Sequence, residues 1–258
     1  MADVSKVNIA LDKKLFDLQI ERFHTLNLSS SSWLLCGASG SGKSVTGMSL
    51  LHEIVTNVPN ARLWICDGKN DDYKFLSELE SNTHNADNVR YFGYLDMSIG
   101  LDKFYDEVFT KRLTGECGSR SFELIALEEW SSVIAMLNAD KETAKIAKKM
   151  LSQAFSITSQ GRAYNVHALF ILQKPQMDFL SGFRENLTSI LALGRLSPEV
   201  AKMCSFNEFK HFNNEESKRA IGYFLNDKNK LHQVQIPHFS PEDFARFKQS
   251  IIEGVTRL

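Results

Sequence analysis

Residues 37–44 read GASGSGKS and directly follow the apolar run SSWLLC at residues 31–36. This octapeptide fits G-x-x-x-x-G-K-[ST], the phosphate-binding loop that joins a buried strand to a helix. The next residues, SVTGMSLLHEIV at 44–55, have the apolar spacing expected of that helix. A Gly/Ser-rich loop that matches by chance would lack this context. We therefore predict that the chain binds a nucleoside triphosphate.

The residue types in the loop match the chemistry of phosphate binding. Its glycines let successive backbone N–H groups turn toward the phosphates, and the helix that begins near Lys43 presents its positive end to them. The Lys43 ammonium would reach the β- and γ-phosphates, and the Ser44 hydroxyl would bind Mg²⁺. The residues predicted to bind ATP are Gly37, Ala38, Ser39, Gly40, Ser41, Gly42, Lys43, Ser44 and Val45.

Length and composition limit the architecture. The chain has 258 residues, of which 43% are hydrophobic and 18 are Phe, enough for one large α/β core. We expect an N-terminal extension at residues 1–30, which could wrap the core or mediate contacts between subunits, and one ATPase domain at 31–258. The formal charge is −1 and the pI is about 6.7, so any contact with nucleic acid must come from local loops or from an assembled ring.

The cysteines and the hydropathy indicate the compartment. The four cysteines, Cys36, Cys66, Cys117 and Cys204, are isolated, with no C-x-x-C pair and no His at metal-ligand spacing. We expect reduced, mostly buried thiols. No apolar run approaches the roughly 18 residues of a membrane span. The sequence thus predicts a soluble, cytoplasmic protein without a signal peptide or anchor of its own, which a partner could recruit to the membrane.

Apolar runs separated by helical patterns predict a mostly parallel sheet covered by helices on both faces. Strands are expected near residues 33–37, 62–67, 90–93, 123–128, 167–173 and 189–193, and helices near 43–57, 71–80, 98–112, 141–160, 197–204 and 241–255. The segments AIGYFLN at 220–226 and KLHQVQIP at 230–237 alternate around DKN like a hairpin, which predicts an antiparallel edge.

A hydrolase of this class also needs carboxylates at the end of a buried strand, and FELIALEEW at 122–130 supplies them. Strands that end in acidic residues are common, but no better candidate lies between this run and the phosphate loop. We assign Glu128 to the metal side, where Asp is usual. The extra methylene should push its carboxylate deeper toward the ion or its waters. Glu129 is the predicted general base.

Two further polar residues are candidates on weaker grounds. Gln173 ends the strand pattern HALFILQ, so its amide could bind the γ-phosphate or the attacking water, or could merely satisfy loop backbone. Arg162 follows a glycine at a predicted helix end, where an arginine is more often a solvated cap.

In combination, these segments resemble the FtsK/SpoIIIE–HerA superfamily of ring-forming DNA translocases. The resemblance is carried by SQAFSITSQGRAYNVHALFILQKPQMDFLSGFRENLTSILALGRLSPEVAKM at 152–203, with Gly161, Arg162, His167, Gln173 and Pro175 at the family's positions. Gly182, Asn186 and the apolar run 190–193 also match. The family's strand ending in Asp-Pro-Lys resembles RLWICDGKNDDYKFL at 62–76, with Gly68 in place of Pro. The predicted C-terminal hairpin resembles the closing hairpin of the family. The likeness is closest to the small FtsK-like and coupling-type ATPases of Gram-positive mobile elements.

This resemblance implies a RecA-like fold and roles for individual residues. Lys43 and Ser44 would bind nucleotide and Mg²⁺, Gln173 would sense the γ-phosphate, and Arg162 would be an arginine finger that reaches the ATP of a neighbouring subunit. The departures are Glu128 for Asp, Lys174 for Arg, and the lack of the winged-helix and membrane domains of the large translocases. These missing domains put sequence-directed motion and membrane anchoring in doubt.

The function expected from these features is a ring-forming ATPase, hexameric by resemblance, that couples Mg-ATP hydrolysis to DNA translocation in conjugation. Genome packaging and protein secretion by an ATPase of the same superfamily are the alternatives, with a relaxase, portal or membrane protein as further partner. A small-molecule kinase is a third interpretation, but the sequence has no Arg-rich lid. Sequence-independent contacts to DNA phosphates are expected from the loop 111–120 or from Lys145, Lys148 and Lys149.

Overall fold

The central feature of the fold is one ten-stranded mixed sheet in the order β2-β1-β10-β9-β8-β3-β7-β6-β4-β5. The computed structural model describes residues 5–30, 32–82, 89–180, 182–211 and 220–258. Strand β3, which carries the phosphate loop, lies inside the sheet between β8 and β7. The predicted fold class, a mostly parallel α/β sheet with an antiparallel side, is confirmed.

Among the described residues, six strands run parallel and place their carboxyl ends along one edge of the sheet. Their alternate side chains fill the layers above and below, so nearly every position is buried, as expected for a sheet covered on both faces. These strands are β3 (Ser32–Gly37), β4 (Arg62–Asp67), β5 (Tyr91–Phe92), β6 (Glu123–Glu128), β7 (Val166–Leu172) and β8 (Leu187–Leu193).

The antiparallel side is wider than the predicted hairpin. The hairpin forms from β9 (Ile221–Leu225) and β10 (Leu231–Gln235), with β9 antiparallel to β8. Beyond it the N-terminal segment adds β1 (Lys6–Asp12) and β2 (Phe23–Asn27), which the sequence analysis did not predict as strands. The short helix α1 (Lys13–Asp17) connects them. The hairpin strands are therefore interior, and β2 forms the edge of the sheet.

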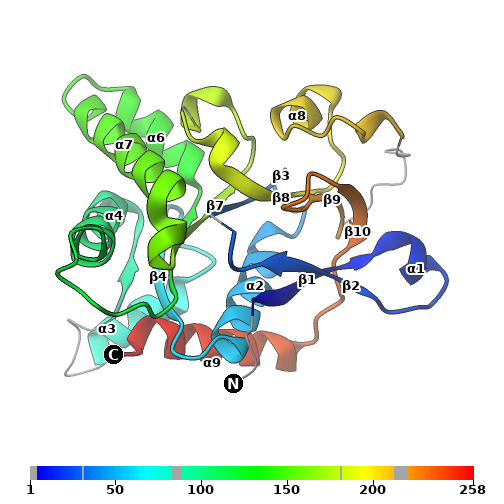
Figure 1. Cartoon of the computed structure of the whole chain (residues 1–258), viewed down its shortest axis with the longest axis horizontal. Coiled ribbons are helices and arrows are strands. Elements are labelled where there is room, and N and C mark those ends of the chain that lie inside the picture. Colours follow the sequence, from blue (N-terminus) through cyan, green and yellow to red (C-terminus); the bar gives the residue numbers. More distant parts are fainter. Residues whose placement is uncertain (1–4, 31, 83–88, 181, 212–219) are drawn as a thin grey trace.

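Helices cover the two faces of the sheet unequally (Figure 1). On one face, α2 (Lys43–Asn57) and α9 (Pro241–Thr256) pack against alternate strand residues such as Trp33 and Leu35. On the other face, the core includes Leu34 and Cys36. The helices packed there are α4 (Met97–Phe104), α6 (Trp130–Asn138), α7 (Ala144–Gln160) and α8 (Pro198–Met203). Neighbouring residues of β3 thus anchor the phosphate loop to both cores.

Several predicted helices differ from the structure. Residues 71–80 contain only a 3₁₀ turn at Lys74–Leu76 and the first part of α3 (Ser77–Asn82). The predicted helix 98–112 is interrupted by a π-helix, η4 (Tyr105–Thr110), which leads into α5 (Lys111–Leu113). α7 begins at Ala144, and α6 follows β6 so closely that it was missed. The cysteines behave as expected, since Cys36, Cys66 and Cys204 are buried free thiols and Cys117 is partly exposed.

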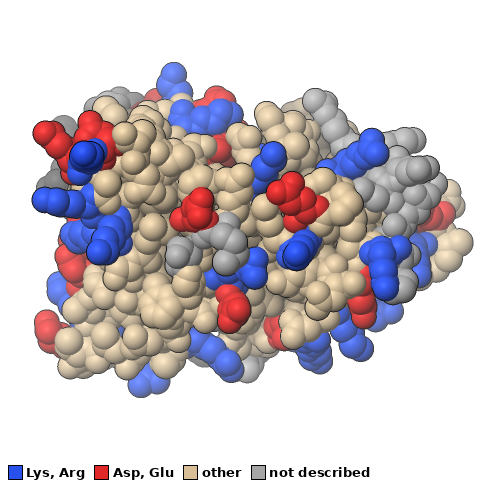
Figure 2. All heavy atoms as spheres, turned by 90° about the horizontal axis from the view of Figure 1, so that it is seen from above, with Lys and Arg blue, Asp and Glu red and all other residues tan. Residues whose placement is uncertain are grey.

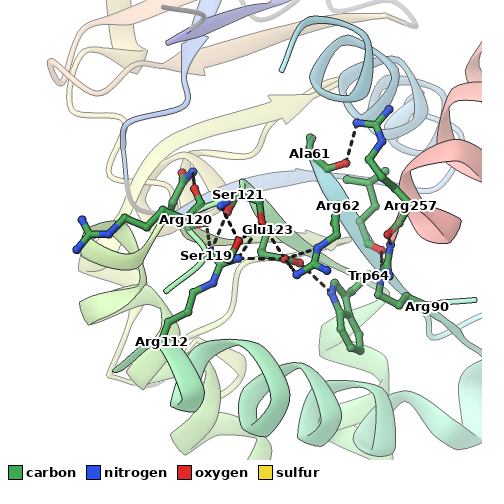
Figure 3. A network of polar contacts seen from close by, with 12 residues as sticks. Ala61, Arg62, Trp64, Arg90, Arg112, Ser119, Arg120, Ser121, Glu123 and Arg257 are labelled. Carbon is green, nitrogen blue, oxygen red and sulfur yellow. Dashed lines mark hydrogen bonds and ion pairs between the residues drawn. The ribbon is translucent and has the colours of Figure 1, made fainter. Parts of the chain in front are cut away.

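A buried ionic network fixes the amino ends of β4 and β6, at the sheet edge opposite the phosphate loop (Figure 3). The fully buried Glu123 carboxylate accepts from Arg62 Nε at 2.5 Å, Arg112 Nη2 at 3.1 Å and Trp64 Nε1 at 3.2 Å. Burial lowers the pKa of Arg112, and Glu123 opposes that shift. Each buried charge therefore has a partner, which is the condition for such a network to be tolerated in a core.

The surface carries charge of both signs. Figure 2 looks down on the face that includes α6, α7 and α8, where Lys and Arg side chains are interspersed with Asp and Glu. Among the described residues, every helix falls short of the length and apolar character that a membrane crossing demands.

Candidate active site

The phosphate loop closes tightly at its two ends. Gly37 has a φ of +155°, and a Cβ there would lie 2.6 Å from the Leu193 carbonyl oxygen and from Ser41 Oγ. Gly42 has a φ of +101° at the N-cap of α2, a conformation that L residues with a side chain rarely adopt. The glycines predicted for this loop are thus required by close approach at one end and by backbone conformation at the other.

The loop presents two polar side chains, Lys43 and Ser41, that could bind a phosphate. Lys43 is only 7% exposed, and its Nζ bonds to the carbonyl oxygen of Ala38 within the loop at 3.2 Å. The buried Ser41 hydroxyl has no hydrogen-bond partner among the described residues. A cradle that holds an ammonium and an unpaired hydroxyl at a helix N-terminus fits the phosphates of a nucleotide.

A cavity of about 770 Å³ opens over the loop and has two chemically different ends. The volume lies within the range of ligand-binding pockets. The polar end is lined by Ser39, Gly40, Ser41, Gly42, Lys43, Ser44, Val45, Lys69, Asp72, Glu129 and Gln173. The other end is mostly apolar, with Phe16, Ala220, Gln235, Ile236, Pro237, His238, Phe239 and Phe244.

Glu129 and Gln173 meet at the polar end of the cavity, as expected from the two strand ends that carry them. Gln173 Nε2 donates to the Glu129 carboxylate at 3.3 Å from Oε1 and 3.5 Å from Oε2. Ser132 Oγ donates to the same carboxylate at 3.1 Å. Glu129 has a φ of +52°, a left-handed conformation at the turn from β6 into α6. A carboxylate on a left-handed backbone position, held by an amide beside a phosphate cradle, is suited to orient a water.

Glu128 occupies a different position. It is 2% exposed, stands apart from the residues that line the cavity, and its Oε2 has no partner among the described residues. Burial, reinforced by the charges of Asp72 and Glu129, raises the pKa of Glu128 to about 8. The predicted metal-side carboxylate therefore lies below the cavity surface.

A carboxylate that was not predicted lies on the cavity instead. Asp72 accepts a hydrogen bond from the hydroxyl of Ser44, the predicted Mg²⁺ ligand. Lys69 lines the cavity beside it and forms an ion pair with Asp71 at 3.0 Å. The available signal was the acidic pair Asp71-Asp72 shortly after the strand 62–67, which is analogous to the acidic pair ending β6.

The apolar end of the cavity was also missed. It combines Phe16 of α1 with residues just after β10, such as Pro237 and Phe239, and with Phe244 of α9. Phe16 remains 41% exposed. These residues come from segments that are far apart in sequence, so no local pattern could group them. A pocket of aromatic and aliphatic side chains next to a phosphate cradle has the chemistry of a nucleobase site.

Arg162 is exposed and lies far from the cavity of its own chain. It is in the 3₁₀ turn η5 (Gly161–Tyr164), which precedes β7, whereas Gln173 follows β7. At ~3.3 Å per residue, this strand separates the two by roughly 23 Å. Arg112 Nη1 anchors the turn through the carbonyl oxygens of Tyr164 at 2.9 Å and Asn165 at 3.4 Å. Of the predicted catalytic residues, Glu129 and Gln173 therefore line the cavity of their own chain, and Arg162 does not.

No protein-family model matches this chain, and no curated protein matches it. Solved structures do match. The conjugation coupling protein TcpA of pCW3, solved as a monomer with ATPγS, aligns with a TM-score of 0.72 and 14% identity over 97% of this chain and 71% of TcpA. The fold is that of RecA-like P-loop ATPases. The genome-packaging NTPase B204 of Sulfolobus turreted icosahedral virus 2, in complex with ATPγS, gives 0.51 and 12% identity over 81% and 98%.

The chain also resembles part of a larger secretion ATPase. The cytoplasmic domain of the type VII secretion ATPase EccC of Thermomonospora curvata aligns with a TM-score of 0.65 and 15% identity over 96% of this chain. This chain spans 31% of that EccC chain. At such identities the likeness shows the fold alone, and the role of the chain has to be argued from its own residues.

Proposed function

We propose that this chain is a P-loop ATPase that hydrolyses Mg-ATP and uses the reaction to move DNA. The observation that carries the proposal is the pairing of Glu129 with Gln173 at the polar end of the cavity, which the phosphate loop also lines. The apolar end would accept the nucleobase. Three parts of one cavity then correspond to base, phosphates and attacking water.

In this proposal each polar residue has a defined role. Lys43 leaves the Ala38 carbonyl to bind the β- and γ-phosphates, and the backbone N–H groups of residues 38–45 bind the phosphate oxygens. Glu129 accepts a proton from the attacking water. The Gln173 amide, which donates to Glu129, can bind the γ-phosphate and lose that contact after hydrolysis.

The residues present also fit a magnesium ion. Mg²⁺ is usually held by one or two protein oxygens together with the substrate phosphates. Ser44 would hold it. Glu128 is the carboxylate predicted for this role, and its Oε2 has no partner among the described residues, but it lies below the cavity surface. When bound, the ion supplies positive charge that neutralises the phosphates.

A ring assembly, hexameric by resemblance, accounts for the position of Arg162. Because this exposed side chain cannot reach the cavity of its own chain, its proposed role as an arginine finger requires a neighbouring subunit. The predicted division into an extension at 1–30 and an ATPase domain at 31–258 belongs to the same proposal. The extension would then contribute Phe16 to the nucleobase end.

DNA contacts are best supported on α7. Lys145 and Lys148 line an open groove of about 450 Å³ between α7 and η4, together with Tyr105 and the acidic Asp106. Lys149 lines it too but is paired with Asp102 at 2.7 Å. In the other candidate segment, 111–120, Arg112 is buried and committed to Glu123, whereas Lys111 and Arg120 are exposed. Exposed lysines bind phosphates without reading sequence, as a translocase requires.

Conjugative transfer is the proposed task, with a relaxase or membrane protein as partner and recruitment of a cytoplasmic chain to the membrane. Packaging of a genome through a portal and secretion of protein are the alternatives. The likeness to B204 and EccC supports keeping both. A translocase of DNA should be stimulated by duplex DNA, whereas a secretion ATPase should respond to a peptide.

The proposal is tested by measuring ATP turnover against protein concentration, with and without duplex DNA, for the wild type and for Arg162→Ala. We expect turnover per chain to rise with concentration and with DNA. Glu129→Gln chains, which retain Arg162, should restore part of the turnover of Arg162→Ala chains when the two are mixed. Turnover that does not change when DNA is added would contradict the proposed DNA translocation. A lack of rescue in the mixture would contradict the role of Arg162 as an arginine finger.

A further inference from the structure

The hydrogen bond from Ser44 to Asp72 joins two parts of the chain that strand order keeps apart. Ser44 is in the first turn of α2, which follows β3, and Asp72 lies in the loop after β4. Strands β7 and β6 separate β3 from β4 in the sheet. The loop after β4 must therefore extend along the carboxyl edge to reach the phosphate loop.

Asp67 folds this loop. Its buried carboxylate accepts from the backbone N–H groups of Lys69 at 3.1 Å, Asn70 at 3.0 Å and Tyr73 at 3.3 Å. An aspartate that binds several following N–H groups fixes the turn that it begins. The position of Asp72 is thus determined by the last residue of β4.

Two glycines let the loop pack closely against the site. A Cβ on Gly68 would lie 2.5 Å from the Glu128 carbonyl oxygen, so the loop passes directly over the end of β6. A Cβ on Gly47, one turn after Ser44 on α2, would lie 3.2 Å from the buried Tyr73 hydroxyl oxygen. Tyr73 therefore packs against α2 and places its neighbour Asp72 beside Ser44.

Glu128 and Asp72 differ in their access to the cavity. Asp72 lines it, whereas Glu128 is 2% exposed and stands apart from that lining. The Ser44 hydroxyl donates its hydrogen bond to Asp72, which leaves the lone pairs of the hydroxyl oxygen for another partner. A carboxylate that orients a metal-binding group in this way is a common feature around protein metal ions.

We propose that Asp72 is the carboxylate that positions the Ser44 hydroxyl for Mg²⁺, taking over part of the role predicted for Glu128. The proposal rests on the proposed nucleotide site. Asp72 acts through Ser44, so it is a positioning residue. The backbone hydrogen bonds that Asp67 accepts hold the turn that carries Asp72.

The test measures metal binding with Mn²⁺ as a spin probe, by electron paramagnetic resonance of the full chain with ATPγS. Asp72→Asn keeps a hydrogen-bond acceptor for Ser44 but removes the charge, and Asp72→Ala removes both. Asp71→Asn is the matched control, since the Asp71 side chain is 66% exposed and pairs with Lys69. We expect Asp72→Ala to weaken Mn²⁺ binding ~10- to 100-fold, Asp72→Asn less, and Asp71→Asn less than twofold.

A double variant separates positioning from damage to the fold. If Asp72 acts through Ser44, the loss from Asp72→Ala in a Ser44→Ala chain should be well below the loss in the wild type. Binding of ATPγS in EDTA should remain near the wild-type affinity in the Asp71 and Asp72 single variants. Wild-type Mn²⁺ affinity in Asp72→Ala, or fully additive losses, would overturn the proposal. Failure of the wild type to bind ATPγS would overturn the nucleotide site itself, and this proposal with it.

Discussion

The Ser44 hydroxyl donates a hydrogen bond to the Asp72 carboxylate, which ties the first turn of α2 to the loop after β4. The same cavity is also lined by Glu129, which follows β6, and by Gln173, which follows β7, so residues after four parallel strands meet there. Brought together at the carboxyl edge, they surround the place where the phosphates would lie. Parallel α/β sheets commonly bind ligands at this edge.

Removing the proposed base should separate hydrolysis from binding. Glu129→Gln retains the size of the side chain and an acceptor for Gln173, but it cannot take a proton from water. We expect turnover to fall ~10²- to 10⁴-fold with ATP affinity nearly unchanged. Ser132→Ala removes only one hydrogen bond to Glu129 and should cost far less. Steady-state turnover and fluorescent-nucleotide titration measure both, and near-wild-type turnover of Glu129→Gln would refute the assignment.

The apolar end of the cavity should contribute to affinity through the base. Phe16→Ala should weaken ATP binding by about 1–2 kcal/mol, the magnitude of one lost base–aromatic stack. Binding of inorganic tripolyphosphate should not change, because it has no base. Leu18→Ala is a suitable control, since Leu18 is 68% exposed and lies just outside α1. Equal losses for ATP and tripolyphosphate would exclude a base contact, and calorimetry distinguishes these results.

Glu128 should make the stability of the nucleotide-free fold decrease as the pH rises from about 4.5 to about 8. Burial raises the pKa of Glu128 from 4.5 to about 8 in the folded chain. Between these values the unfolded chain has lost a proton that the folded chain still holds. Its stability contribution is therefore complete below pH 4.5 and is lost as the pH rises toward 8.

This loss amounts to about 1.4 kcal/mol per unit of pH within that window. Glu128→Gln removes the titration, so its urea unfolding in EDTA should weaken less with pH than that of the wild type. The difference between the two slopes isolates this residue from other titrating groups. Parallel slopes would mean that Glu128 is ionised in the folded chain.

The ionic network around Glu123, at the amino ends of β4 and β6, should contribute strongly to the stability of the fold. Glu123→Ala would leave Arg112 buried without its carboxylate partner (Figure 3). Breaking a buried pair in this way typically costs ~3–5 kcal/mol. Glu107→Ala, at an exposed glutamate on the nearby π-helix, should change the free energy of unfolding far less. A chemical-denaturation series that ranks the two variants equally would contradict the role of the network.

Sequence reasoning found what is contiguous in the chain. The phosphate loop and its two flanking elements occupy one stretch, and buried strands that end in Glu129 and Gln173 carry their own signal. Asp72 and Phe16 had no sequence signal of comparable strength. Their contacts depend on how the loop after β4 and the β1–β2 hairpin fold back across the sheet. β1 and β2 were missed for a related reason, since a charged segment becomes a strand only when β10 offers an edge to pair with.

The central claim is that the cavity binds and hydrolyses Mg-ATP through the phosphate loop. The most direct measurement is ATP turnover by the purified chain in the presence of Mg²⁺, compared between the wild type and a folded Lys43→Ala variant. We predict measurable turnover in the wild type and its loss in Lys43→Ala. Equal turnover in both proteins, or no turnover by the wild type at any concentration with or without DNA, would contradict the account.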